Sequence, residues 1–314
     1  MKYAVFSDVH GNAPALRLAL EDARKHGAEG FLFAGDYCIS APWPNEVITL
    51  IRDIPGARFI RGNNDDLYVF PHDDSGQYEI ARWCRDTLTD ENRRWLHDLP
   101  EELTFSCEDV TVRMAHSSEA FVGKTLHAHY RTSSLARMYP DGNVAHETLL
   151  QDFRSRMAGD AAFTACIDHQ EPGVYIFGHN HIQCFGDFNG RLLVNPGGCG
   201  DPLDCEECCA PYTLLTIENG RCAVTERRIP YDPEPLIAQV RQSSQYAAAR
   251  VWSELMFMSW RTRREKMGSF IRYCIQFAER IGDPRRPFAR DTWEAAYEEW
   301  RTIAPALQPE LFVR

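Results

Sequence analysis

The chain has 314 residues, 44% of them hydrophobic and 25% charged, and its formal net charge is −11. These values are ordinary for a soluble globular protein, and the negative charge argues against a nucleic acid or an anionic membrane surface as the main partner. No apolar stretch approaches the roughly 20 residues needed to span a bilayer. Because the first residues lead straight into a strand without a signal segment, we expect a cytoplasmic protein.

Over the first hundred residues, apolar runs typical of buried strands alternate with segments of helical periodicity. The expected strands cover 2–7, 29–34 and 57–60. The expected helices cover 13–26, a segment after Asn45, and 79–98. Polar residues stand just after these strands, at the edge where open α/β sheets bind ligands.

From about residue 103 the pattern changes to short strands. We expect them at 103–107, 110–115, 174–177, 183–188, 191–194, 212–217 and 222–229. The pairs Asn189-Gly190 and Asn219-Gly220 predict hairpin turns, and a further helix is expected over 145–158. The simplest architecture that uses both halves is an α/β (α+β) fold in which two mixed β-sheets pack together and helices cover them, a four-layer αββα sandwich.

Three prolines between Ile229 and Pro235 predict a boundary between a first domain, 1–230, and a helical C-terminal appendage, 231–314. Helical segments are expected over 236–304, including 250–260 and 292–303. The appendage has 13 basic and 11 acidic residues, a net charge of +2. Its four tryptophans predict an apolar face that packs on the first domain, with a substrate lid or a dimer contact as the alternatives. These tryptophans are Trp252, Trp260, Trp293 and Trp300.

Seven side chains able to bind metal ions follow the strand-like runs. They are Asp8, His10, Asp36, Asn63, His116, His179 and His181. In Asp8-Val-His10 and His179-Asn-His181, alternation along an extended chain places two ligands on one side. Imidazole, carboxylate and amide ligands together suit manganese, iron, zinc or nickel. Two such ions bridged by one carboxylate, about 3.5–4 Å apart, could clamp both oxygens of a phosphoryl displacement.

Each motif also has an ordinary structural explanation when taken alone. Asp8 and His10 could form a turn before a capped helix. Asn63 could be a turn residue after Gly62, and His116 could be a hydrogen-bonded core histidine. The order of the whole set favours a metal site over these separate explanations.

The order Asp8-Val-His10-Gly, Gly35-Asp36, Gly62-Asn63-Asn-Asp65, His116 and Gly178-His179-Asn-His181 resembles the calcineurin-like metallophosphoesterases over roughly residues 1–229. The segment Leu193-Val-Asn-Pro-Gly-Gly198 is similar to one in the small bacterial phosphodiesterase branch, which is related to diadenosine tetraphosphatases. The resemblance implies a dinuclear centre of two divalent ions, of manganese, iron, zinc or nickel.

The resemblance also implies how the ligands divide. Asp36 would bridge the two ions, and a hydroxide shared by them would be the nucleophile. The first ion would be held by Asp8, His10, Asp36 and His181. The second would be held by Asp36, Asn63, His116 and His179.

One position departs from the pattern. The phosphomonoesterase and protein-phosphatase branches have a histidine directly after the metal-binding asparagine, and it assists the leaving group. Here that position is Asn64, which cannot donate a proton and become a stable anion. We therefore expect a phosphodiester or phosphoanhydride substrate, because a leaving phosphate needs less help than an alkoxide. The alternative is that Asp65 or a histidine after His116 supplies the acid.

We accordingly expect four residues to take part in catalysis: Asp36, Asn64, Asp65 and His116. Substrate contacts are expected at Asn12, Arg61 and Asn64, although helix capping is the plainer role for Asn12 and a solvent-facing position is an alternative for Arg61. Three histidines could line the pocket or be structural: His127, His129 and His146.

Eleven cysteines suit a reducing compartment if most are buried thiols. A group of four, Cys199, Cys205, Cys208 and Cys209, could bind zinc or form a redox pair, but the spacing matches no complete zinc signature, so plain thiols are the simpler interpretation.

The leading hypothesis is a metallophosphoesterase that acts on a small phosphorylated substrate, possible examples being nucleotides, and that could form homo-oligomers. A serine/threonine-type protein phosphatase or phosphomonoesterase is the runner-up. A noncatalytic scaffold with the same fold, as in the retromer scaffold subunit, is a third hypothesis, which the complete ligand set disfavours.

Overall fold

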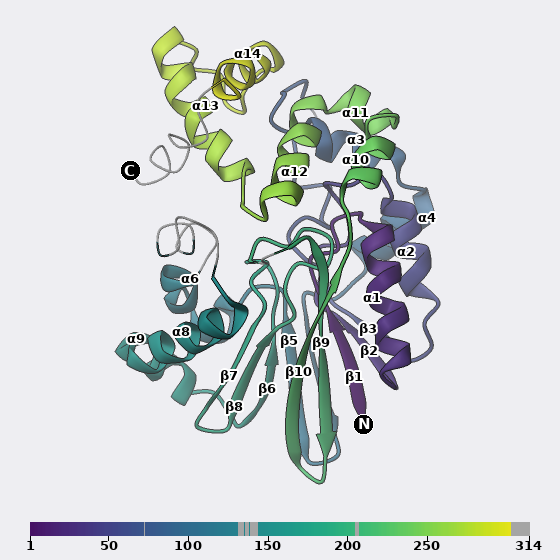
Figure 1. Cartoon of the computed structure of the whole chain (residues 1–314), viewed down its shortest axis with the longest axis vertical. Coiled ribbons are helices and arrows are strands. Elements are labelled where there is room, and N and C mark those ends of the chain that lie inside the picture. Colours follow the sequence, from purple (N-terminus) through teal and green to yellow (C-terminus); the bar gives the residue numbers. More distant parts are fainter. Residues whose placement is uncertain (72, 131–134, 136–137, 139–143, 205–206, 303–314) are drawn as a thin grey trace.

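The structure is a computed structural model that describes residues 1–302 except 72, 131–134, 136–137, 139–143 and 205–206. Figure 1 shows two β-sheets packed face to face, with helices on the outer side of each sheet and a further group of helices at one end. The predicted four-layer αββα sandwich with C-terminal helices is confirmed.

The first sheet has the strand order β10-β9-β1-β2-β3. In that order its strands are Arg221–Pro230, Cys209–Glu218, Lys2–Phe6, Gly30–Phe33 and Arg58–Phe59. Strands β1, β2 and β3 are parallel, and β9 runs antiparallel beside β1. Residues Ala4 to Phe6 are fully buried, which is why β1 reads as an unbroken apolar run rather than an alternating one.

The second sheet has the strand order β4-β5-β6-β8-β7. In that order its strands are Glu102–Cys107, Val110–Ala115, Gly173–Ile176, Arg191–Asn195 and Cys184–Phe188. Both predicted Asn-Gly hairpins are present, joining β7 to β8 and β9 to β10. Asn189, Gly190, Asn219 and Gly220 all have positive φ, as a two-residue type I′ turn requires.

The outer layers consist of two sets of helices. The first sheet is covered by α1 (Ala13–Lys25), α2 (Pro44–Arg52), α3 (Glu79–Thr87) and α4 (Asp90–His97). The second sheet is covered by α5 (Glu119–Val122), α6 (Thr125–His129), α8 (His146–Gly159) and α9 (Ala161–Asp168).

The helical structure predicted over 79–98 is confirmed, and the segment is divided into α3 and α4. Leu88 is extended between them, and Thr89 Oγ1 accepts the Asn92 N–H at 3.2 Å as the N-cap of α4.

An apolar core holds the two sheets together. Val5 and Leu32 from the first sheet meet Val112, Ile176 and Val194 from the second, all with almost no exposed surface. This core fixes the edges of the two sheets relative to each other, and therefore fixes the loops that leave those edges.

The C-terminal segment is helical, as predicted, within the described residues. Its helices are α10 (Glu234–Val240), α11 (Ser244–Ala248), α12 (Arg250–Thr262), α13 (Met267–Ile281) and α14 (Arg290–Trp300). Trp260, Trp293 and Trp300 are buried in their apolar clusters, and Trp252 is partly buried. In the described part of the chain, no helix combines the length and apolar character that a bilayer crossing requires.

Candidate metal centre

The seven predicted ligands lie in loops that follow the parallel strands of both sheets. Asp8 follows β1, Asp36 follows β2 and Asn63 follows β3. His116 follows β5 directly, and His179 and His181 lie in the loop after β6. Because the sheets face each other, these loops meet at one end of the sandwich.

Backbone hydrogen bonds tie these loops together. Asp8 N–H donates to Gly35 O at 3.0 Å, and His10 N–H donates to Asp36 O at the same distance. The His179 N–H donates to the Asp8 carboxylate at 3.0 Å. Segments separated by up to 171 residues in the chain are thus joined around the same point.

Five of the seven predicted ligands have positive φ, a region that non-glycine residues seldom occupy. They are Asp8, His10, Asp36, His179 and His181, with φ between 49° and 70°. Such conformations cost of order 1–3 kcal/mol each and persist only where the surrounding structure enforces them. Their concentration at one point indicates a site built for function.

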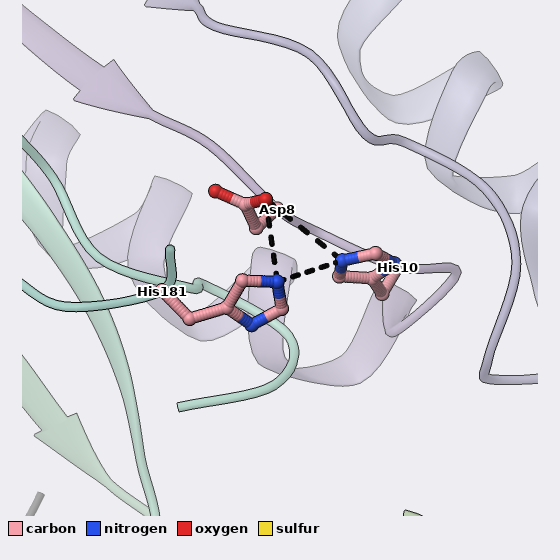
Figure 2. Close-up of side chains that lie close together, drawn as sticks. All are labelled: Asp8, His10 and His181. Carbon is pink, nitrogen blue, oxygen red and sulfur yellow. Dashed lines mark hydrogen bonds and ion pairs between the residues drawn. The ribbon is translucent and has the colours of Figure 1, made fainter. Parts of the chain in front are cut away.

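The first cluster consists of Asp8, His10 and His181 (Figure 2). His10 Nε2 lies 3.1 Å from His181 Nε2, and Asp8 Oδ1 lies 3.4 Å from His181 Nε2. The two imidazole rings are stacked, with centroids 4.8 Å apart. Three potential ligand atoms therefore face one small volume.

The second cluster consists of Asp8, Asp36 and His116. Asp36 Oδ2 lies 3.3 Å from His116 Nε2 and 3.8 Å from His10 Nε2, so this carboxylate stands between the two clusters. Beside it, Asn63 Oδ1 lies 2.8 Å from His179 Nδ1.

The hydrogen bonds of three histidines leave their Nε2 atoms able to bind a cation. Nδ1 of His10, His116 and His181 each donates to a backbone carbonyl, at 2.6 to 2.9 Å. In a neutral imidazole the Nε2 atom then carries a lone pair, and each of these atoms faces the carboxylates. Two lone pairs 3.1 Å apart, on His10 and His181, repel unless a positive charge lies between them. The buried Nε2 atom of His116 makes no hydrogen bond at all.

The pKa shifts also reflect a shortage of positive charge. Burial by itself lowers the pKa of His116, but the carboxylates of Asp36 and Asp8 outweigh it and raise the pKa to about 10. Burial by itself raises the pKa of Asp36, but the charge of His116 brings it well below the ordinary value. A metal ion would supply the charge that a proton on His116 otherwise supplies.

The glycines of the motifs leave room for the ligands. A Cβ atom on Gly62 would lie 2.1 Å from Asp36 Oδ1, and one on Gly178 would lie 2.6 Å from Asp8 Oδ2. Any side chain at either position would displace a carboxylate.

Asn64 and Asp65 both hold Asp36 in place. Asn64 donates from its backbone N–H to Asp36 Oδ1 at 2.8 Å and from Nδ2 to Oδ2 at 2.7 Å. The buried carboxylate of Asp65 accepts the N–H groups of Asp36, Tyr37 and Gly62 at 2.8 to 2.9 Å. Burial and the Asp36 charge raise the pKa of Asp65 to about 7, while the N–H donors oppose that rise. These contacts give Asp65 a positioning role beneath the centre.

Two of the predicted substrate contacts are engaged elsewhere. Asn12 is fully buried: Oδ1 caps α1 by accepting Ala15 N–H, and Nδ2 donates to Gly200 O. In this conformation Asn12 is therefore closed to substrate and takes the capping role. Arg61 donates to Glu101 at 2.7 Å and to the His97 carbonyl at 3.1 Å, so its guanidinium is already engaged, although the residue borders a cavity at the centre.

The other histidines take different places. The His127 ring lies 6.0 Å from the His179 ring and lines the pocket at the centre. His146 lies in an ion-pair network with Glu226, at 2.6 Å, and Arg228. The side chain of His129 lies outside the described residues.

The cysteine group has no metal-site geometry among its described members. Cys199, Cys208 and Cys209 are buried, and burial raises the pKa of Cys199 and Cys208, which disfavours the thiolate form that binds metals. Cys205 lies outside the described residues.

Two cavities open beside the metal centre, and His179 borders both. One, of about 370 Å³, is lined by His10, His181 and Asn64. The other, of about 460 Å³, is lined by Asn63, His116 and Arg61.

Sequence reasoning missed several residues of the first cavity. They are Ile39, Ser40, Asn180, Asp201, Leu203, Trp252, Glu265, Gly268 and Arg272. The last four come from the C-terminal segment, on α12, on α13 and in the turn between them. No motif marks them, and only their place in the fold brings them to the site.

Residues 1–220 match the profile of the calcineurin-like phosphoesterase superfamily domain. This chain belongs to the calcineurin-like phosphoesterase superfamily. It is thus a metallophosphoesterase, a hydrolase that acts on phosphate ester bonds. Members of this family depend on metal ions. In this chain the clusters at Asp8 and Asp36 are candidate metal sites.

Individual proteins are also similar to this chain. An uncharacterised protein from Methanocaldococcus jannaschii is 30% identical over 224 residues, which cover 64% of this phosphoesterase and 77% of the relative. A hypothetical protein from Pyrococcus horikoshii has a similar structure, with a TM-score of 0.57 and 19% identity over 80% of this chain and 97% of the other. A metallophosphoesterase from Sphaerobacter thermophilus gives a TM-score of 0.52 and 20% identity, with coverage of 80% and 98%. At these identities the two structures show a shared fold.

Proposed function

We propose that this protein is a dinuclear metal-dependent phosphoesterase that hydrolyses small phosphodiesters or phosphoanhydrides. The observation that carries the proposal is the arrangement of the ligands. The Nε2 atoms of His10, His116 and His181 are oriented by backbone carbonyls toward two carboxylates, and the carboxylate of Asp36 stands between the two clusters.

The proposed ligand sets follow from these positions and from the family resemblance. One ion would be held by Asp8, His10, Asp36 and His181, and the other by Asp36, Asn63, His116 and His179. Two bound divalent ions would supply positive charge that lowers the pKa of a water molecule and neutralises phosphoryl oxygens.

The chain's own residues have separate tasks. Asn64 donates two hydrogen bonds to the Asp36 carboxylate, and Asp65 accepts the backbone N–H of Asp36, so that the Asp36 carboxylate keeps one orientation. The carbonyls of Ala34, Ile39 and Asp201 hold the imidazole rings with Nε2 toward the centre. The surrounding structure thus holds the ligand side chains in place, including the five ligands with positive φ.

Two observations support a diester or anhydride over a monoester. Asn64 lines the first cavity and stands where the resemblance implies a histidine that assists the leaving group, and its amide cannot give up a proton and become a stable anion. The centre also lies between two cavities, so that each of the two substituents on a diester phosphorus could occupy one of them.

The cavity dimensions support a small substrate. Volumes of about 370 and 460 Å³ fall in the range of small-molecule sites, and the C-terminal helices form part of the wall of the first cavity. A segment of a folded phosphoprotein would need a more open approach. The full set of ligand side chains also argues against a noncatalytic scaffold.

The test is a substrate screen with purified full-length protein supplied in turn with manganese, iron, zinc and nickel. The substrates are an aryl diester, the matching aryl monoester, bis-nucleoside polyphosphates, cyclic nucleotides and a phosphoserine peptide. We expect kcat/KM for the diester or an anhydride to exceed that for the monoester at least about tenfold. A large preference for the monoester or for the peptide would contradict the proposal.

A further inference from the structure

The C-terminal helices form one wall of the cavity at His10 and His181. That wall consists of Trp252 from α12, Glu265 from the turn before α13, and Gly268 and Arg272 from α13. We refer to these four residues as the helical wall. In Figure 1, α12 lies above the end of the sheets from which the ligand loops emerge.

The helical wall is held to the loops that carry the metal ligands. Trp260 Nε1 on α12 donates to Gly200 O at 3.2 Å. Gly200 directly precedes Asp201, whose carbonyl accepts the His181 Nδ1–H at 2.7 Å. Trp252 Nε1 donates to Gln77 O at 2.9 Å. The position of α12 is therefore fixed relative to the centre by direct contacts.

A second set of contacts anchors the far end of the segment. Arg290, at the start of α14, pairs with Glu79 of α3 at 2.6 Å, and Gly76 N–H donates to Phe288 O at 2.9 Å. Trp293 is fully buried against Phe270, with ring centroids 4.6 Å apart, which ties α14 to α13. Helix α13 is thus supported from both sides.

The charges that line this cavity are mostly negative. Asp201 and Glu265 line it, and Asp8 and Asp36 lie at the adjoining centre. Among the described residues that line the cavity, Arg272 alone is an arginine or lysine. Burial raises the pKa of Glu265, and the positive charge of Arg272 opposes that rise, so the two side chains lie within each other's field.

An anionic substrate needs a cation besides those of the metal centre, particularly in a protein with a net charge of −11. Arginine suits this task because its planar guanidinium can donate two parallel hydrogen bonds to a phosphoryl group. Ile39, Leu203 and Trp252 add apolar surface to the same cavity.

We propose that Arg272 binds the phosphoryl oxygens of the substrate, so that the C-terminal helices complete the substrate site of this phosphoesterase. The substituent of the phosphate would then lie against Ile39, Leu203 and Trp252, which favours an ester with an apolar or flat group. This inference rests on the proposed function, because it takes the cavity at His10 and His181 as a substrate cavity.

The primary test is equilibrium binding of inorganic phosphate to the metal-loaded full chain, by calorimetry, for the wild type and three variants. Arg272→Gln should raise the Kd for phosphate by about 10- to 100-fold, the range for a lost hydrogen bond to a charged group. Arg272→Lys should recover part of the affinity. Arg280→Gln, on the exposed side of the same helix, is the matched control and should bind phosphate like the wild type.

A fourth variant separates phosphate binding from a purely structural ion pair. If Arg272 only held the helical wall in place through an ion pair with Glu265, breaking the pair from either side would weaken phosphate binding equally, so an equal loss in Glu265→Gln and Arg272→Gln would overturn the proposal. We expect the opposite, that Glu265→Gln binds phosphate at least as tightly as the wild type, because a negative charge is removed. Thermal unfolding of each variant checks that the fold is kept.

Steady-state kinetics on an aryl diester provide the second readout. Arg272→Gln should raise KM more than it lowers kcat, as expected when binding to the ground state is lost. If the wild type hydrolyses neither diesters nor anhydrides but Arg272→Gln still loses phosphate affinity, the proposed function fails and this inference stands. If Arg272→Gln keeps the wild-type Kd and KM, the inference fails while the proposed function remains.

Discussion

The metal centre and the C-terminal helices bury opposite kinds of side chain. At the centre, Asp8, Asp36 and His116 have 0 to 6% of their surface exposed, and their neighbours in the first cluster have strained backbone. In the C-terminal helices, Trp293 and Trp300 have no exposed surface and pack against aromatic rings.

The difference separates function from stability. Burial of a large apolar side chain stabilises a fold by roughly 1.5–3 kcal/mol, whereas buried carboxylates and left-handed residues destabilise it unless a partner compensates. The helices therefore stabilise the protein by themselves, whereas the proposed metal centre would need a bound cation to offset its buried carboxylates. Substitutions at the centre should therefore mainly lower activity, and substitutions in the C-terminal helices should mainly lower stability.

The largest expected effect is at the centre. Asp36→Asn should lower kcat/KM about 1,000-fold and lower the bound metal content, because the carboxylate proposed to bridge the ions is lost. Its thermal unfolding midpoint should fall, because the variant loses the stabilisation that bound metal supplies and leaves buried His116 without its carboxylate partner. Turnover and metal analysis check the first result, and calorimetry checks the second.

The matched control for that variant is Asp53→Asn, because the Asp53 side chain is 77% exposed at the end of α2. It should leave turnover, metal content and unfolding unchanged. Wild-type turnover in Asp36→Asn would refute the bridging role.

In the C-terminal helices the expected effect is on stability. Trp293→Ala should lower the free energy of unfolding by about 3–5 kcal/mol, because it empties the site packed by Phe270 and Phe288. Denaturant unfolding measures this change. Ile281→Ala, at a side chain 53% exposed on α13, is the control and should change stability by less than about 0.5 kcal/mol. Equal stability of the two variants would show that the tryptophan cluster is not a core.

An intermediate effect is expected on substrate preference. Asn64→His should raise the ratio of monoester to diester hydrolysis at least about tenfold, because an imidazolium can protonate an alkoxide leaving group. Paired kinetics on the aryl monoester and diester measure the ratio. An unchanged ratio would mean that the acid, where one is needed, comes from another residue.

The smallest effect is on the pH dependence of stability where the C-terminal helices meet α3. Burial raises the pKa of Glu79, the partner of Arg290, from 4.5 to about 7. The folded state then binds more protons than the unfolded state between these values, so stability should fall as pH rises through that range. Glu79→Gln should lose this contribution.

The measurement is the difference in unfolding midpoint between the wild type and Glu79→Gln from pH 4 to 8. We expect the wild type to lose stability relative to the variant across the window. The exposed Glu279→Gln should show a constant difference. A constant difference for Glu79→Gln as well would mean that its carboxyl group titrates normally in the folded state.

Local signals predicted most of the secondary structure. Both Asn-Gly hairpins form, because type I′ turns need only residues that accept positive φ. The break between α3 and α4 was missed, although Thr89 followed by two acidic residues is a helix start signal. The continuous helical periodicity of the segment concealed it.

The ligand types were also predictable, but several roles were not. Asn12 and Arg61 stand next to the motifs in sequence, yet their partners are Gly200, 188 residues away, and Glu101, 40 residues away. Arg272 has no motif at all and reaches the cavity because α12 packs on the loop at Gly200. Contacts of this kind depend on the whole chain.

The sequence alone determined the chemistry of the centre and the strand ends that carry it, because alternation, turn residues and ligand types are local properties. Tertiary structure decided that His181 meets Asp8 and His10, that Asp36 stands between the two clusters, and that α13 supplies a wall of the cavity. The physical reason is that burial of apolar surface between the two sheets, and of the tryptophans in the C-terminal helices, sets these long-range positions.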